Sequence, residues 1–112
     1  MRVVLDHCVP RRLGALLAPH DVTTVGALGL ADLDDGPLLD RLAGACDALV
    51  TVDRRLPAQQ RLAGRPFAVV VVRARTNRLG DLAPLAPALL AALPGAPAGQ
   101  ATVERSSRSV TV

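Results

Sequence analysis

The sequence predicts one α/β domain of three layers, a Rossmann-like α/β/α arrangement with a mostly parallel central sheet. Short apolar runs alternate with segments of helical periodicity, which is typical of this class. The run FAVVVV at 67–72 is apolar at every position, as expected for a central parallel strand that is covered on both faces. No linker divides the 112 residues, so we expect a single domain over 1–112, with a core of about 1–93 and C-terminal strands at about 101–112.

In the first half, two strands and two helices are expected. The apolar run 3–5 predicts a strand, and 10–18 predicts a helix that has a proline in its first turn and leucines on one face. The β-branched run 22–25 predicts a second strand, and the leucine spacing in 37–46 predicts a second helix. Asp35 precedes that helix in a position suited to an N-cap.

In the second half, strands and helices continue to alternate. The sequence predicts a strand at 48–52, a short helix at 58–62, the strand 67–72, a helix at 82–93, and two short strands within 101–112 that form a hairpin. The C-terminal strands would leave an exposed edge on which a second copy of the chain could pair, so a homodimer is one expectation.

The composition excludes some classes of function. Phe67 is the only aromatic residue, so the core must be built of Val, Leu and Ala, and base stacking is excluded as a main binding mode. The net charge of +3 predicts no partner by itself. Cys8 and Cys46 form no C-x-x-C motif and are expected to be reduced. No signal peptide or membrane-length apolar run is present, so we predict a cytoplasmic protein that does not contact the membrane.

Two predicted strands end in a carboxylate. Asp6 follows the first strand and Asp53 follows the third, and the carboxyl ends of parallel strands gather at one edge of a sheet, where ligands bind. Asp35, at the start of a helix, is placed to join them. Carboxylates that meet in this way stay ionised when a cation lies among them, and oxygen ligands suit Mg²⁺ or Mn²⁺. Thr51 lies on the same side of its strand as Asp53 and is expected to orient it.

Arginine clusters follow the same strands. Arginine binds phosphate by forked hydrogen bonds, so these side chains predict contact with a nucleic-acid backbone. A metal held by acids can activate water for phosphodiester cleavage. The acids and arginines together predict a small metal-dependent nuclease. The predicted substrate-binding residues are Arg11, Arg12, Arg54, Arg55, Arg75, Asn77 and Arg78, and Arg73 belongs to the same rim.

Four segments carry a family resemblance. LDHCVPRRL, DDGPLL, LVTVDRRLPAQQ and VVVVRARTNRL, in this order and spacing, resemble the PIN-like family catalogued as DUF5615 over about 1–93. The resemblance implies a PIN domain that cleaves RNA with a divalent metal, as in the toxin of a bacterial toxin–antitoxin pair that is silenced by a cognate antitoxin.

The family's site residues are carried over one by one. Asp6 matches the first acid, Asp35 the acid at the helix start, and Asp53 the acid after the third strand, which implies catalytic and metal-binding roles for all three. Asn77 lies where a further polar residue is found. The chain departs from the family at 7–8, where His and Cys stand in the opening motif. For the fourth acid of PIN nucleases, Asp81 is the only candidate.

Other interpretations stay open at this point. The three acids could be turn or capping residues, and Asp34 could replace Asp35 as a ligand. His7 could be a metal ligand, a proton shuttle or a surface residue. The domain could be a catalytically weakened PIN-like module that binds RNA or protein. It could also be a phosphoryl-accepting receiver domain, although such domains use a late lysine and the sequence has none.

Overall fold

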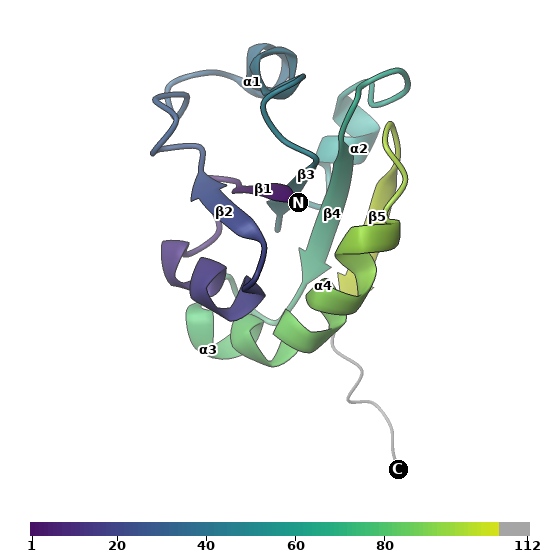
Figure 1. The fold of residues 1–112 in the computed structure, drawn as a ribbon. Helices are drawn as coiled ribbons and strands as arrows, with labels where there is room; N and C mark the ends of the chain where they lie inside the picture. The colour runs from purple at the N-terminus through teal and green to yellow at the C-terminus, as the bar shows by residue number, and fades with distance from the viewer. Residues whose placement is uncertain (106–112) are drawn as a thin grey trace.

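The central sheet has five strands, all parallel, in a computed structural model that describes residues 1–105 (Figure 1). The strand order is β2-β1-β3-β4-β5, so the chain crosses the sheet in both directions from β1. The strands are β1 (Arg2–Leu5), β2 (Asp21–Thr24), β3 (Ala48–Thr51), β4 (Ala68–Arg73) and β5 (Ala101–Arg105). The predicted three-layer Rossmann-like α/β fold is confirmed.

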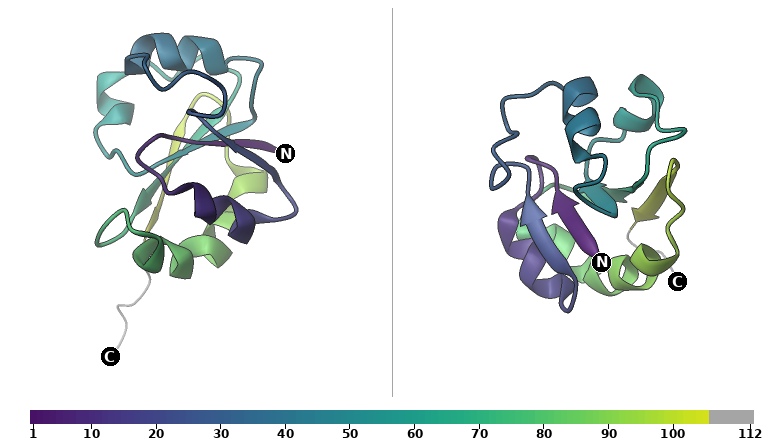
Figure 2. Two further views of the ribbon diagram at one scale, coloured as in Figure 1. Left: turned by 90° about the vertical axis from the view of Figure 1, so that its left-hand side faces the viewer. Right: turned by 45° about the horizontal axis from the view of Figure 1, so that its top comes forward.

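Helices cover both faces of the sheet, as the two views of Figure 2 show. One face carries the helices α1 (Asp35–Leu42) and α2 (Leu56–Gln59). The other face carries the 3₁₀ helix η1 (Arg11–Leu17) and a chain of short helices: α3 (Leu79–Leu82), η2 (Ala83–Leu85), α4 (Ala86–Ala92) and η3 (Leu93–Gly95).

The core consists of two apolar layers, one on each side of the sheet. Alternate residues of a strand point to opposite faces. Val70 and Val72 therefore pack with Leu89 of α4, while Val69 and Val71 pack in the layer that contains Leu38 of α1. β4 is buried from Ala68 to Val72, as the apolar run predicted.

The helices are shorter than predicted. The segment 10–18 is a 3₁₀ helix of seven residues rather than an α-helix. The helix expected at 37–46 ends at Leu42, just before Gly44 turns the chain with a φ of +82°. The helix expected at 82–93 is broken into short pieces, because Pro84 and Pro87 lack the N–H that a continuous helix needs. The short helix expected at 58–62 lies at 56–59.

The predicted C-terminal hairpin is only partly within the described residues. β5 is its first strand, and it pairs in parallel with β4 as the margin of the main sheet. The second strand of the predicted hairpin falls on 106–112, outside the described residues.

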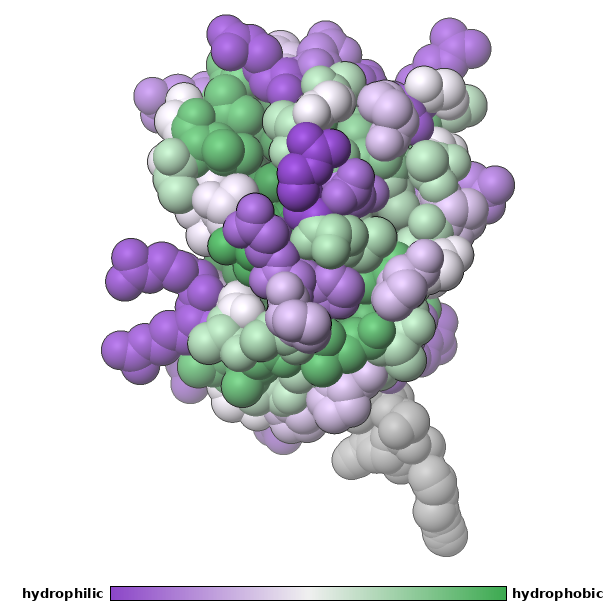
Figure 3. Space-filling view, in the orientation of Figure 1, coloured by the Kyte–Doolittle hydropathy of each residue, from purple (hydrophilic) through white to green (hydrophobic). Residues whose placement is uncertain are grey.

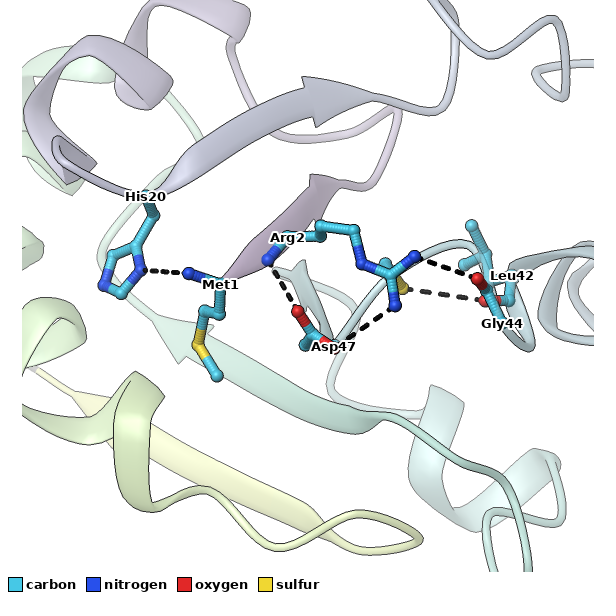
Figure 4. A network of polar contacts seen from close by, with 7 residues as sticks. Met1, Arg2, His20, Leu42, Gly44 and Asp47 are labelled. Carbon is cyan, nitrogen blue, oxygen red and sulfur yellow. Dashed lines mark hydrogen bonds and ion pairs between the residues drawn. The ribbon is translucent and has the colours of Figure 1, made fainter.

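Polar contacts fasten the amino end of the sheet (Figure 4). The backbone N–H of Arg2 donates to Asp47 Oδ2 at 2.7 Å, and its guanidinium donates to the Gly44 carbonyl at 2.9 Å and to Asp47 Oδ1 at 3.4 Å. His20 Nδ1 lies 3.3 Å from the Met1 nitrogen. These contacts tie β1 to the turns before β3 and β2.

The surface is mixed in polarity. Figure 3 shows long hydrophilic side chains at the periphery and an apolar area over the loop between β2 and α1, where Leu28 is 40% exposed. Within residues 1–105, no helix has both the length and the apolar character needed to span a membrane.

Candidate functional site at the carboxyl end of the sheet

Asp6 is the buried centre of the candidate site. It directly follows β1, where its N–H donates to the Val50 carbonyl at 2.9 Å, and only 2% of the residue is exposed. Its Oδ2 accepts a hydrogen bond from the Thr51 hydroxyl at 2.7 Å, and its Oδ1 accepts one from the His7 N–H at 2.8 Å. The His7 ring contributes a further contact, with Nδ1 2.9 Å from Asp6 Oδ1. Both carboxylate oxygens are therefore held in place.

Thr51 connects Asp6 to the loop that follows β3. Its hydroxyl donates to Asp6 and accepts the N–H of Asp53 at 3.1 Å. The Cys8 sulfur also lies 3.7 Å from this hydroxyl, and burial raises the pKa of the Cys8 thiol. Thr51 is fully buried, so its hydroxyl fixes the first acid relative to the backbone of the second.

Asp53 begins the turn into α2. Its Oδ1 accepts the N–H of Arg55 at 2.9 Å, which is the local bond that favours aspartate in turns. The carboxylate is half-buried. Asp53 is therefore a turn residue and not the N-cap of α2, which is Arg55 and has no side-chain capping bond.

Asp35 belongs to α1 itself, so its prediction as the N-cap is wrong. The N-cap residue is Asp34, which has extended backbone and makes no capping bond with its side chain. Burial raises the pKa of Asp35, and the negative charges of Asp6 and Asp53 raise it further, while His7 opposes the shift. The charges of Asp6 and Asp53 thus act on Asp35, although the three predicted acids are distant in sequence.

The carboxylates fit a divalent cation in chemistry but do not form a closed set of ligands. In residues 1–105, no three His, Cys, Asp or Glu side chains are grouped so that they could hold a metal ion. Mg²⁺ commonly uses only one or two protein carboxylates and completes its shell with water and substrate phosphate. Mutual repulsion among the acids also favours a cation between them. Residues Asp35 and Asp53, with Asp6 behind them, are compatible with such a site.

A basic cavity lies beside the acids, at the carboxyl ends of β3, β4 and β5. Its volume is about 570 Å³. It is lined by the four arginines Arg54, Arg73, Arg75 and Arg105, together with Val52, Val72, Ala74, Thr76 and Asn77. Arg105 was not among the predicted site residues, because its place depends on the parallel pairing of β5 with β4, which no local sequence signal shows.

The other predicted arginines do not line the basic cavity. Arg11 lines a hollow of about 530 Å³ beside β2, and Arg12 is exposed on the same helix η1. Arg78 and Asn77 line a hollow of about 430 Å³ with His7 and Cys8, where Asn77 Nδ2 donates to the Cys8 carbonyl at 3.1 Å. The predicted arginines therefore do not all line one cavity.

Three remaining candidates have local roles. The carboxylate of Asp81, in the first turn of α3, accepts a hydrogen bond from the Thr76 hydroxyl. Cys8 and Cys46 are both free thiols, in agreement with the predicted reduced state. The Cys46 thiol is buried, and burial raises its pKa to about 11.

Comparisons of the chain with protein-family models, with curated proteins and with solved structures found no match.

Proposed function

We propose that the protein is a metal-dependent endoribonuclease of PIN type. The observation that carries this proposal is that burial and the charges of Asp6 and Asp53 raise the pKa of Asp35, at the same end of the sheet as a cavity lined by arginines. A carboxylate whose pKa is raised by burial and by neighbouring charges is a candidate functional residue. The further role, as a toxin that a cognate antitoxin holds silent, rests on the motif resemblance alone.

In this proposal each residue has a defined task. Asp35 and Asp53, with Asp6 behind them, would hold Mg²⁺ or Mn²⁺, and the ion would supply an activated water and charge stabilisation at the scissile phosphate. Thr51 and His7 orient Asp6, because each donates a hydrogen bond to one oxygen of its carboxylate. The arginines of the neighbouring cavity bind the RNA backbone.

The test measures Mn²⁺ binding by calorimetry and RNA cleavage in the same preparations. We expect Asp53→Asn to lower metal-dependent cleavage by about 100-fold or more, since even residues that only support metal ligands contribute factors of about 10 to 100. Asp32→Asn is the matched control, because Asp32 is an exposed carboxylate in the loop before α1. Cleavage that persists in a pure Asp53→Asn preparation would disprove the proposal.

A second candidate is an RNA-binding module without catalysis. It is favoured by one observation, the absence of a closed set of metal ligands among residues 1–105. This candidate predicts RNA binding that does not respond to Mg²⁺ or Mn²⁺, with no cleavage. Sustained Mn²⁺-dependent turnover would exclude it.

A further inference from the structure

We infer that the four arginines Arg54, Arg73, Arg75 and Arg105, here called the basic pocket, form a phosphate-binding subsite for an RNA strand that works without a divalent metal. The inference rests on the proposed function for the identity of the ligand. It deepens that function by stating which four arginines bind the RNA phosphates, with Arg105 included, and that this binding does not need the metal.

The sheet register forces two of these charges together. Arg73 and Arg105 are direct partners across the β4–β5 pairing. Neighbouring parallel strands lie about 4.8 Å apart, and partnered residues point to the same face. Two guanidinium groups thus leave the sheet side by side, and their repulsion is relieved when an anion binds between them.

The basic pocket has no internal counter-charge among residues 1–105. None of its four arginines forms an ion pair within this part of the chain, whereas Arg2 pairs with Asp47 and Arg65 pairs with Asp40. No acidic residue lines the cavity. The fold therefore neutralises some of its arginines and leaves this group available to an external anion.

The surroundings of the basic pocket indicate on which face of β5 the RNA strand lies. Arg75 and Arg105 also line a hollow of about 710 Å³ that contains Asp81 and Glu104. Glu104 alternates with Arg105 along β5 and so points to the α4 face. A phosphate chain is repelled there, and the opposite face of β5 is open, since Val103 on that side is 45% exposed.

The basic pocket is linked to the carboxylates along the chain, although none of the three acids lines it. Arg54 lines the basic pocket and directly follows Asp53. In the proposed function the scissile phosphate lies at Asp53, and the neighbouring phosphates of the strand extend to the four guanidinium groups. Arginine matches phosphate with two parallel hydrogen bonds, and the scarcity of aromatic residues leaves the backbone as the recognised feature. We therefore assign the pocket to RNA rather than to an acidic peptide.

The test is the salt dependence of binding to a short fluorescent single-stranded RNA in EDTA, followed by anisotropy. Each phosphate contact contributes about 0.7 to the slope of log K against log salt concentration for single strands. We expect Arg73→Gln/Arg105→Gln to lower this slope by about 1.4 and Arg105→Gln alone to lower it by about 0.7. Arg41→Gln/Arg61→Gln removes the same net charge at exposed sites outside the pocket and should keep the wild-type slope.

Further variants separate the assignment from loss of folding. Arg73→Lys/Arg105→Lys keeps both charges and should retain the slope. Arg105 is exposed at the sheet margin, so the single Arg105→Gln variant tests the pocket even if the double variant unfolds. EDTA prevents metal-dependent cleavage, so RNA binding is measured independently of it. A wild type that binds RNA in EDTA but does not cleave it with Mn²⁺ would disprove the nuclease and leave the basic pocket standing.

Three outcomes would overturn the pocket itself. The first is a wild type that does not bind RNA in EDTA. The second is a wild-type slope in both glutamine variants. The third is competition by a polyglutamate peptide that equals competition by RNA of the same charge.

Discussion

At the scale of the residue, the buried acid at the end of β1 is explained by its hydrogen bonds. A buried charge is costly unless it is paired and hydrogen-bonded. Asp6 receives bonds from Thr51 and His7, and no buried side-chain N or O atom in the described part of the chain lacks a partner. The hydroxyl of Thr51 is the central contact, because it is the one side chain that bonds Asp6 from another strand.

We expect Thr51→Val to lower the free energy of unfolding by about 1–3 kcal/mol, the usual cost of leaving a buried polar group without its partner. The loss has two parts, the bond to Asp6 and the bond from the Asp53 N–H. Urea denaturation measures it. Thr51→Ser keeps the hydroxyl and should be closer to the wild type, and equal stability of the two variants would contradict the assigned role.

The site residues differ in how well the sequence predicts them. Asp6 and Asp53 follow apolar strands, and the parallel arrangement alone brings such positions to one edge of the sheet. The N-cap was predicted at Asp35, one residue too late, because the end of a helix depends on backbone geometry and two neighbouring aspartates are equally suited to the position. Arg105 was missed, since its partner Arg73 is more than thirty residues away along the chain.

At the scale of the element, η1 is held to the sheet by a few leucines rather than by helical hydrogen bonding. Leu13 and Leu17 are fully buried, while Leu16 on the same helix is 42% exposed. A 3₁₀ helix has poorer hydrogen-bond geometry than an α-helix, so packing must supply its stability. Gly14 permits the close approach, because a Cβ there would lie 3.0 Å from Val22 Cγ1.

This arrangement predicts different costs for two truncations within one helix. Leu13→Ala should lower the free energy of unfolding by about 2–5 kcal/mol, because it leaves a cavity in the core. Leu16→Ala should change it by less than about 0.5 kcal/mol, as is usual at exposed positions. Chemical denaturation of both variants provides the comparison, and similar costs would show that η1 is not anchored through its buried side.

The sequence predicts strands better than helices here. The first four strands begin and end within one residue of their predicted positions, because short runs of apolar and β-branched residues are strong local signals. The helix predicted at 82–93 is not a single element. Its leucines have helical spacing, but two prolines interrupt it. The parallel pairing of β5 was not predicted, because strand pairing is set by contacts far apart in sequence.

At the scale of the whole molecule, the two ends of the sheet carry opposite electrostatic arrangements. At the amino end, hydrogen bonds from the Arg2 backbone and side chain lower the pKa of Asp47. At the carboxyl end, burial and the charges of Asp6 and Asp53 raise the pKa of Asp35. At the amino end, Arg2 neutralises Asp47. At the carboxyl end, the acids are available to a cation and the arginines of the basic pocket to an anion.

The two shifts have opposite consequences for stability. The ordinary pKa of both groups is 3.8. The stabilisation from Asp47 is present above that value and is lost as the pH falls through its lower folded pKa. The contribution of Asp35 is complete below 3.8 and is lost as the pH rises through its higher folded pKa. Together they favour maximal stability near the ordinary aspartate pKa, with a decline on either side.

We therefore expect Asp35→Asn to be more stable than the wild type at neutral pH, with a difference that disappears below pH 3.8. Asp47→Asn should be less stable at neutral pH, and the double variant should have the flattest pH profile. Urea midpoints measured from acid to neutral pH test this, with Asp32→Asn as an exposed control. If Asp35→Asn is instead destabilised at neutral pH, the attraction of this carboxylate to the α1 dipole outweighs its repulsion by the other acids. The electrostatic case for a cation site at this end of the sheet would then fail.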